Sequence, residues 1–155
     1  MSRHKSEYSI SERGVEEDIL PTCRENGIAF VPYCPLGRGF LTGNIRSLDS
    51  LPPNDRRRED PRFSAENLPH NLRILDAVTM VAARHGVTNA RVSLAWLLAQ
   101  GQDVVPIPGV KRRETMRDSA ESPNLTLTTD DLWAIEEAAP VGATYGLPKL
   151  AQVRL

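Results

Sequence analysis

The chain has 155 residues, of which 40% are apolar and 25% are charged, and its formal net charge is −1. This length suits one domain with a buried core. The composition excludes a collagen-like, disordered or membrane-spanning chain. A net charge this close to zero gives no overall attraction to nucleic acid or anionic lipid. The N-terminus lacks the apolar region of a secretory signal, and two cysteines form neither a disulfide framework nor a metal-binding pair, so we predict a cytoplasmic protein without a metal site.

The first third of the chain predicts a strand, a helix and a second strand. EYSI at 7–10 is a short strand candidate, and 16–26 has the apolar spacing of a helix. Pro21 should lie near the start of this helix, and Gly27 should end it. IAFVPY at 28–33 is apolar on both faces, which is typical of a buried strand in a parallel sheet.

A long irregular stretch occupies 34–69, with several glycines and prolines and the charged run 56–60. Loops of this length are usually functional or disordered. The charged run is interpreted as solvated surface, with a lid beside a ligand as the alternative. An amphipathic helix then ends near Gly86, and Thr88 caps a largely apolar helix over 89–100.

The last third predicts one strand and two helices. VVPIP at 104–108 is the strand, a helix follows over 111–121, and Thr128 or Thr129 caps another over 130–139. The residues 140–155 look like a loose tail. Strands that alternate with helices predict right-handed parallel βαβ units. A sheet of three strands leaves two unpaired edges, which indicates that the chain is part of something larger or associates with itself through these edges.

Two loops carry residues suited to binding. After the second strand come Tyr33, Gly37, Arg38 and Gly39. The glycines would let backbone amides approach a bound group, and the arginine adds a cation. An ordinary glycine turn beside a packed tyrosine is the alternative.

After the third strand, Pro108 and Gly109 lead into Lys111, Arg112 and Arg113 at the start of a helix. Cations are unfavourable at a helix N-terminus, so a bound anion would explain them, and a phosphate fits guanidinium groups well. A solvated basic turn is the alternative. Because ligands gather at the carboxyl ends of parallel strands, both loops together suit an extended dinucleotide.

These stretches resemble the aldo-keto reductase superfamily. The resemblance is carried by EYS at 7–9, ILPTCRENGIAFVPYCPLGRGFLTG at 19–43 and SLAWLLAQGQDVVPIPGVKR at 93–112. It implies that 1–155 is a partial domain of this family: the last three β/α units of a (β/α)8 TIM barrel, an incomplete barrel with extra helices. It also implies NADP(H) as the cofactor.

The resemblance assigns roles to ten cofactor-binding residues. Tyr33 would stack on the nicotinamide ring, and the backbone from Cys34 through Leu36 and Gly37 to Arg38 would line the pyrophosphate. The adenosine 2′-phosphate and the adenine would be held by Gly109, Lys111, Arg112, Asp118 and Ser119.

The sequence departs from the family pattern at three of the positions considered. Cys34 replaces a serine, Ser119 replaces an asparagine, and Lys5 stands where a glutamine bonds the nicotinamide carboxamide. The family's catalytic aspartate, tyrosine, lysine and histidine precede this part of the barrel, so we assign no catalytic residue. The intact enzyme would transfer hydride between NADP(H) and an aldehyde or ketone. A non-enzymatic interaction module, or a truncated product, is the alternative for this chain.

Overall fold

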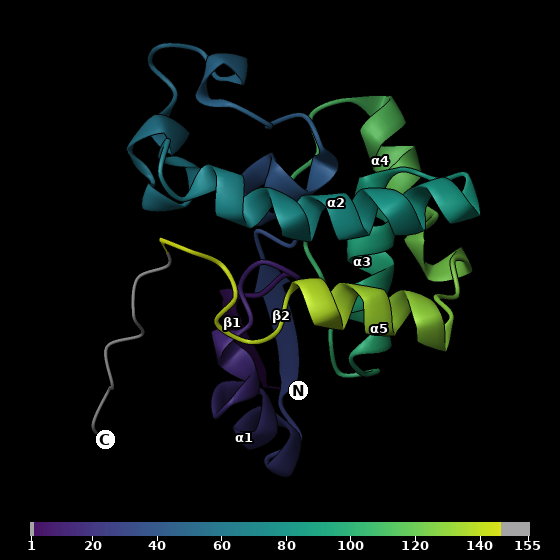
Figure 1. The fold of residues 1–155 in the computed structure, drawn as a ribbon. Helices are drawn as coiled ribbons and strands as arrows, with labels where there is room; N and C mark the ends of the chain where they lie inside the picture. The colour runs from purple at the N-terminus through teal and green to yellow at the C-terminus, as the bar shows by residue number, and fades with distance from the viewer. Residues whose placement is uncertain (1, 147–155) are drawn as a thin grey trace.

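A computed structural model describes residues 2–146 (Figure 1). Its strands and α-helices, in chain order, are β1 (Arg3–Glu7), α1 (Ile19–Glu25), β2 (Ala29–Tyr33), α2 (Leu68–His85), α3 (Asn89–Ala99), α4 (Arg113–Ala120) and α5 (Thr129–Ala138). Short 3-10 helices lie between them: η1 (Gly14–Glu16), η2 (Gly37–Thr42), η3 (Leu48–Ser50), η4 (Arg56–Glu59), η5 (Pro61–Phe63) and η6 (Ser122–Asn124). The alternation of strands and helices confirms the predicted α/β class.

The sheet is parallel and centres on β2. β1 pairs with β2 in a register that runs from Arg3 opposite Ala29 to Glu7 opposite Tyr33. On the other side of β2 the chain 104–107 runs alongside: the Val105 amide donates to the Phe30 carbonyl at 2.9 Å, and the Ile107 amide donates to the Pro32 carbonyl at 3.1 Å. The predicted third strand therefore occupies its expected place, although it forms only a bridge because prolines interrupt the ladder.

The first strand was predicted in the wrong place. β1 is the polar segment RHKSE, and the predicted strand 7–10 overlaps it only at Glu7. Tyr8 and Ile10 are fully buried, but they lie in the turn that follows β1. Their apolar character reflects burial in the core and not a strand. Main-chain pairing with β2 defines β1, and this pairing leaves no apolar pattern in the sequence.

The helix ends follow the predicted capping residues. Gly27 and Gly86 have φ angles of 62° and 64°, the left-handed conformation that glycine adopts at a helix end. The Thr88 side chain accepts a hydrogen bond from the Arg91 amide at the start of α3. Thr128 caps α5. These local signals located α1, the end of α2, α3 and α5.

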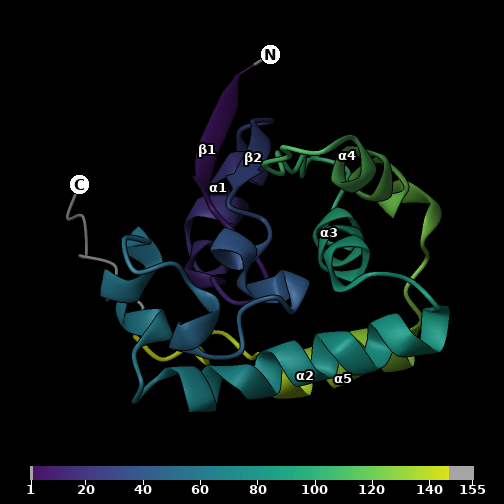
Figure 2. The ribbon, with the colours of Figure 1, turned by 90° about the horizontal axis from the view of Figure 1, so that it is seen from above.

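α1 packs on β2, and the other α-helices pack on one another. α2 and α5 lie side by side and run in opposite directions, and α3 lies between this pair and α4 (Figures 1 and 2). The core contains an aromatic cluster in which Tyr8 meets both Phe30 of β2 and Trp96 of α3 edge to face. The helix-facing side of the sheet is thus closed, and its opposite face is the open one.

The irregular stretch after β2 is built from 3-10 turns, and its charged run is not simply solvated. Arg57 bonds to Asp55 and to the Arg38 carbonyl. Arg58 donates to the Leu48 and Leu51 carbonyls of the same loop. The interpretation as solvated surface is therefore wrong for these arginines, because their guanidinium groups hold the loop together.

The described part of the predicted loose tail is attached to α2. Asn71 donates from its side-chain amide to the Tyr145 carbonyl at 3.0 Å, and its side-chain oxygen accepts from the Tyr145 amide at 2.8 Å. Thr144 is buried. Thr144 and the backbone of Tyr145 thus attach 140–146 to the rest of the fold, and 147–155 lie outside the described residues. None of the helices within 2–146 is long and apolar enough to cross a membrane.

Asp131 of α5 bonds His85 of α2, and we expect this carboxylate to make the stability of the fold fall in acid. Burial alone would raise the pKa of Asp131, but hydrogen bonds from His85 (2.7 Å) and Thr128 outweigh it and lower this pKa to about 2. A carboxylate with a lowered pKa stabilises the fold above about pH 4 and loses this contribution as the pH falls towards 2. We expect the free energy of unfolding to drop by about 2 kcal/mol through this group across that range. Urea titrations at several pH values would measure it, and Asp131→Asn should flatten the slope; an unchanged slope would contradict the prediction.

Candidate cofactor-binding site

The carboxyl ends of the strands meet at one edge of the sheet. Tyr33 ends β2 opposite Glu7, which ends β1. The hydrogen bond from the Ile107 amide to the Pro32 carbonyl brings the third extended segment to the same edge, one residue before Tyr33. The two loops singled out in the sequence therefore leave the sheet side by side.

Tyr33 lies on the open face of the sheet. In a parallel pair, residues in register share a face and alternate along each strand, so Lys5, Glu7, Val31 and Tyr33 lie on the same side. The Lys5 ammonium nitrogen is 5.8 Å from the centroid of the Tyr33 ring. The tyrosine ring is only partly buried, so a flat ligand can reach it, and a cation lies beside it.

The loop after Tyr33 has unusual backbone geometry. Cys34 and Arg38 adopt left-handed φ angles of 49° and 57°, which are uncommon for residues with a side chain. Gly37 is buried, and a Cβ atom there would lie 2.8 Å from the Ser11 hydroxyl. The Leu36 carbonyl accepts hydrogen bonds from two later amides of the loop. Glycine at 37 is thus required for close packing, which neither interpretation of the loop anticipated.

Arg38 belongs to a network of four charges that the sequence did not reveal. It donates to Glu7 at 3.3 Å and to Asp60 at 3.1 Å. Arg62, with a side chain that is 8% exposed, bonds the same two carboxylates at 2.8 Å each. Burial would raise the pKa of Asp60, but the bonds from Arg62 lower it below its ordinary value. The charges of the two arginines and the two acids cancel, so Arg38 adds no free positive charge to this edge of the sheet.

The thiol of Cys34 lies close to this network. Burial and the Glu7 carboxylate raise the pKa of Cys34, while Arg38 and Arg62 oppose the change. The side chain therefore remains a neutral thiol near pH 7 and adds no negative charge beside a phosphate.

The second loop keeps its cations in solvent. Lys111, Arg112 and Arg113 are all exposed, and within residues 2–146 none of them forms a salt bridge. Arg112 is the N-cap of α4 and Arg113 its first residue. Gly109 has no left-handed φ, and a Cβ there would meet nothing within 4 Å. Neither backbone conformation nor packing therefore requires glycine at 109, and the basic turn lies where it was expected.

The two residues expected near the adenine lie on α4, and one of them is occupied by other contacts. Asp118 accepts from Arg91 at 2.9 Å and also from the Thr88 hydroxyl. It ties α4 to the start of α3. Ser119 is half-buried, and its carbonyl accepts from the Ser122 hydroxyl at 2.7 Å. The structure thus gives Asp118 a structural role.

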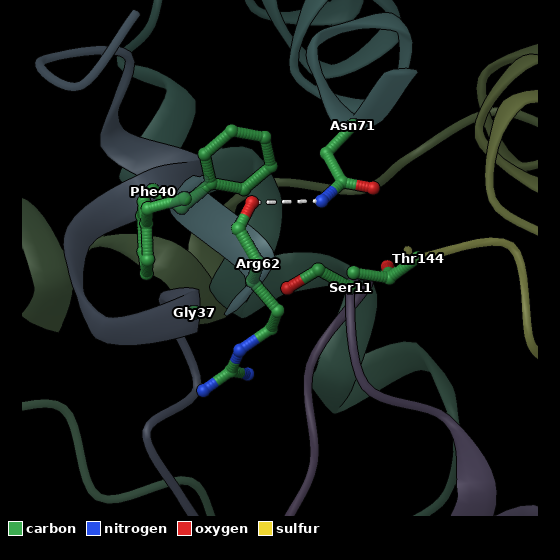
Figure 3. A pocket seen from close by; sticks show the side chains of 7 residues that line it. Ser11, Gly37, Phe40, Arg62, Asn71 and Thr144 are labelled. Carbon is green, nitrogen blue, oxygen red and sulfur yellow. Dashed lines mark hydrogen bonds between the residues drawn. The ribbon is translucent and has the colours of Figure 1, made fainter. Parts of the chain in front are cut away.

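A small cavity lies behind the glycine loop and not at the sheet edge (Figure 3). Its volume is about 10 Å³, which is room for about one water molecule. Asn71 projects toward it and donates to the Arg62 carbonyl at 2.9 Å. The lining residues are Ser11, Gly37, Phe40, Arg62, Phe63, Asn71 and Thr144. This cavity cannot hold a dinucleotide.

The side chains at that edge fit one part of a dinucleotide better than the other. Three solvated cations at the start of a helix suit a terminal phosphate, because guanidinium and ammonium groups donate to its oxygens. Arg38 is already neutralised by Glu7 and Asp60. Pyrophosphate binding at the first loop would have to rely on the backbone.

No cluster of His, Cys, Asp and Glu in the described part of the chain is arranged to hold a metal ion.

Comparisons with known proteins all point to one family. Residues 2–140 match the model of the aldo/keto reductase family. A probable aldo-keto reductase 1 of Glycine max is 42% identical over 140 residues, which are 90% of this chain and 40% of that protein. An NADP(+) aldo-keto reductase, yakc, of Schizosaccharomyces pombe is 39% identical over 144 residues, 90% of this chain and 42% of that protein. The chain thus spans about two fifths of the length of these relatives.

Solved structures share the fold. A glycerol dehydrogenase from Gluconobacter oxydans superposes with a TM-score of 0.81 at 24% identity, over 95% of this chain and 44% of that one. A thermostable aldo-keto reductase in complex with the inhibitor epalrestat gives a TM-score of 0.62 at 25% identity, over 88% and 39% of the two chains. These neighbours are TIM barrels, and the partial parallel sheet corresponds to an incomplete barrel, which confirms the predicted fold.

Proposed function

This chain belongs to the aldo/keto reductase family, an oxidoreductase family, and from that premise we propose that it supplies the NADP(H)-binding part of such an enzyme. The observation that carries the proposal is the basic turn. Lys111, Arg112 and Arg113 stay solvated at the same sheet edge as Tyr33. The name of the Schizosaccharomyces pombe relative, which specifies NADP(+), supports the choice of cofactor.

In this proposal each loop holds one end of the cofactor. Lys111 and Arg112 bind the adenosine 2′-phosphate, which favours NADP(H) over NAD(H). The Tyr33 ring stacks on the nicotinamide, and the backbone from Cys34 to Arg38 lies along the pyrophosphate. Bound NADPH would supply the hydride for reduction of an aldehyde or ketone in the intact enzyme.

No described residue is assigned as a catalytic acid or base in this proposal. Burial and a hydrogen bond to Glu16 raise the pKa of Tyr8, so its hydroxyl is a poor proton donor. Tyr145 stacks on His70 at 4.8 Å. The chain by itself would bind the cofactor without turning over a carbonyl substrate.

Thermal unfolding with and without NADP+ tests the proposal. A ligand of the native state at 100 times its dissociation constant stabilises it by about 2.7 kcal/mol, so we expect a rise of several degrees in Tm. Lys111→Gln should weaken binding about tenfold, because a charge-assisted contact with phosphate is lost. NAD+, which lacks the 2′-phosphate, should raise Tm less than NADP+.

Arg117→Gln is the matched control, since Arg117 is an exposed cation in the last turn of the same helix. It should leave the NADP+ shift unchanged. A cooperative transition that NADP+ does not move would contradict the proposal.

That outcome would favour the second candidate, an interaction module without cofactor. Two observations speak for it. Among residues 2–146, β1 pairs on one side only, and Val105 and Ile107 are 53% and 44% exposed. A solution mass above that of the monomer would then be expected.

A further inference from the structure

We infer that Lys5 makes this site discriminate between the two redox states of the cofactor, in favour of NADPH over NADP+. The inference rests on the proposed function, in which Tyr33 stacks on the nicotinamide. It goes beyond that function by naming the residue that sets which form binds better.

The first step is the position of the Lys5 ammonium. It lies over the Tyr33 ring, 5.8 Å from the ring centroid, on the open face that both strands present. The side chain is exposed and belongs to the middle residue of β1, opposite Val31 and two positions before Tyr33 in the register. A ring stacked on Tyr33 would therefore bind near a full positive charge.

The second step is that no acid among the described residues offsets this charge. Glu7, the acid two residues further along β1, uses one carboxylate oxygen for Arg62 at 2.8 Å and the other for Arg38 at 3.3 Å. Asp60 is bonded to the same two arginines. The four-charge network is neutral as a whole, so Lys5 leaves a net positive charge beside Tyr33.

The third step is the chemistry of the nicotinamide ring. The ring carries a positive charge in NADP+ and is neutral in NADPH, while the rest of the two molecules is identical. A fixed cation beside the ring repels only the oxidised form. Like charges several ångströms apart at a solvent-exposed site weaken binding by about threefold to tenfold.

Hydrogen bonding by Lys5 does not distinguish the two redox states. An ammonium can donate to the carboxamide oxygen in either redox state, so it adds affinity for both. The repulsion is the part that differs between the two states. Lys5 thus acts on the ratio of the two affinities, and the basic turn at Lys111 acts on both equally.

The test is the ratio of two dissociation constants, measured by calorimetry on the purified chain with NADP+ and with NADPH. NADP+ should bind about threefold to tenfold more weakly than NADPH. Lys5→Gln should bring the ratio close to one, and Lys5→Arg should preserve it. Salt should reduce the ratio in the parent chain, because it screens exposed charges.

Two controls separate the possible failures. Lys111→Gln should weaken both forms by the same factor and leave the ratio unchanged. Adenosine 2′,5′-bisphosphate, which has no nicotinamide, should bind the parent chain and Lys5→Gln equally. Equal affinities for NADP+ and NADPH in the parent chain, or an unchanged ratio in Lys5→Gln, would overturn the inference and leave the proposed function in place. Binding of neither form would overturn both.

Discussion

Replacing Arg13 by methionine should lower the free energy of unfolding by about 3 to 4 kcal/mol, because it removes one partner from a buried ion pair. The guanidinium group is almost enclosed and makes bonds in several directions. It bonds Glu16 at 2.8 Å through two nitrogens, and a third nitrogen donates to Glu136 at 2.6 Å and to the Ala139 carbonyl at 2.7 Å. It also lies over the Trp96 ring, 5.2 Å from the centroid. Its loss would leave Ala139, which is 1% exposed, without this donor.

Arg24→Met is the matched control for Arg13→Met. Arg24 also bonds a carboxylate and a carbonyl, those of Asp103 and Gln100, but its side chain is 43% exposed. An exposed pair contributes about 0 to 1 kcal/mol, so the control should change little. Urea unfolding followed by circular dichroism gives both values. Similar losses in the two variants would show that burial does not set the contribution of Arg13.

Arg62→Met should cost about 3 kcal/mol for the same reason, in a different part of the molecule. Arg62 joins Glu7 at the end of β1 to Asp60 in the loop, and both carboxylates are largely buried, at 15% and 11% exposure. Without Arg62 these two acids would face each other with one arginine left. Proteolysis should then cut the 44–67 loop faster, in addition to the loss seen in urea.

Arg38→Met provides the comparison, because Arg38 bonds the same two carboxylates from a side chain that is 44% exposed. We expect a loss of at most about 1 kcal/mol. A larger effect for Arg38→Met than for Arg62→Met would mean that the outer arginine, and not the buried one, holds the loop to the sheet.

The elements that the sequence predicted well are those whose ends depend on local chemistry. Thr88 and Thr128 accept hydrogen bonds from the first turns of their helices, and Gly27 and Gly86 end helices in the left-handed region. Each of these features involves residues a few positions apart, so a sequence pattern contains them. β1 was missed because its residues are polar and its definition depends on pairing with β2, 26 residues further along.

In the candidate site, too, features made by neighbouring residues were predicted and features made by distant residues were not. The basic turn at Lys111 was predicted from neighbouring residues and lies at the expected edge. The network around Arg38 was not, because its partners Glu7 and Asp60 are 31 and 22 residues away in the chain. Asp118 likewise bonds Arg91, 27 residues away. Nothing in the local sequence distinguishes a charge that faces solvent from one that is already paired.

The two prolines of the third extended segment give the sheet two unequal edges. The amides of Val105 and Ile107 point to β2, and successive residues of a strand point to opposite sides. Pro106 and Pro108 therefore face outward, where neither has a hydrogen to donate. β1, in contrast, contains no proline, and none of the described strands pairs with its outer side. A second chain would add at β1 and not beyond the prolines. The prolines thus protect their edge of the sheet against the strand-by-strand addition that leads to aggregation.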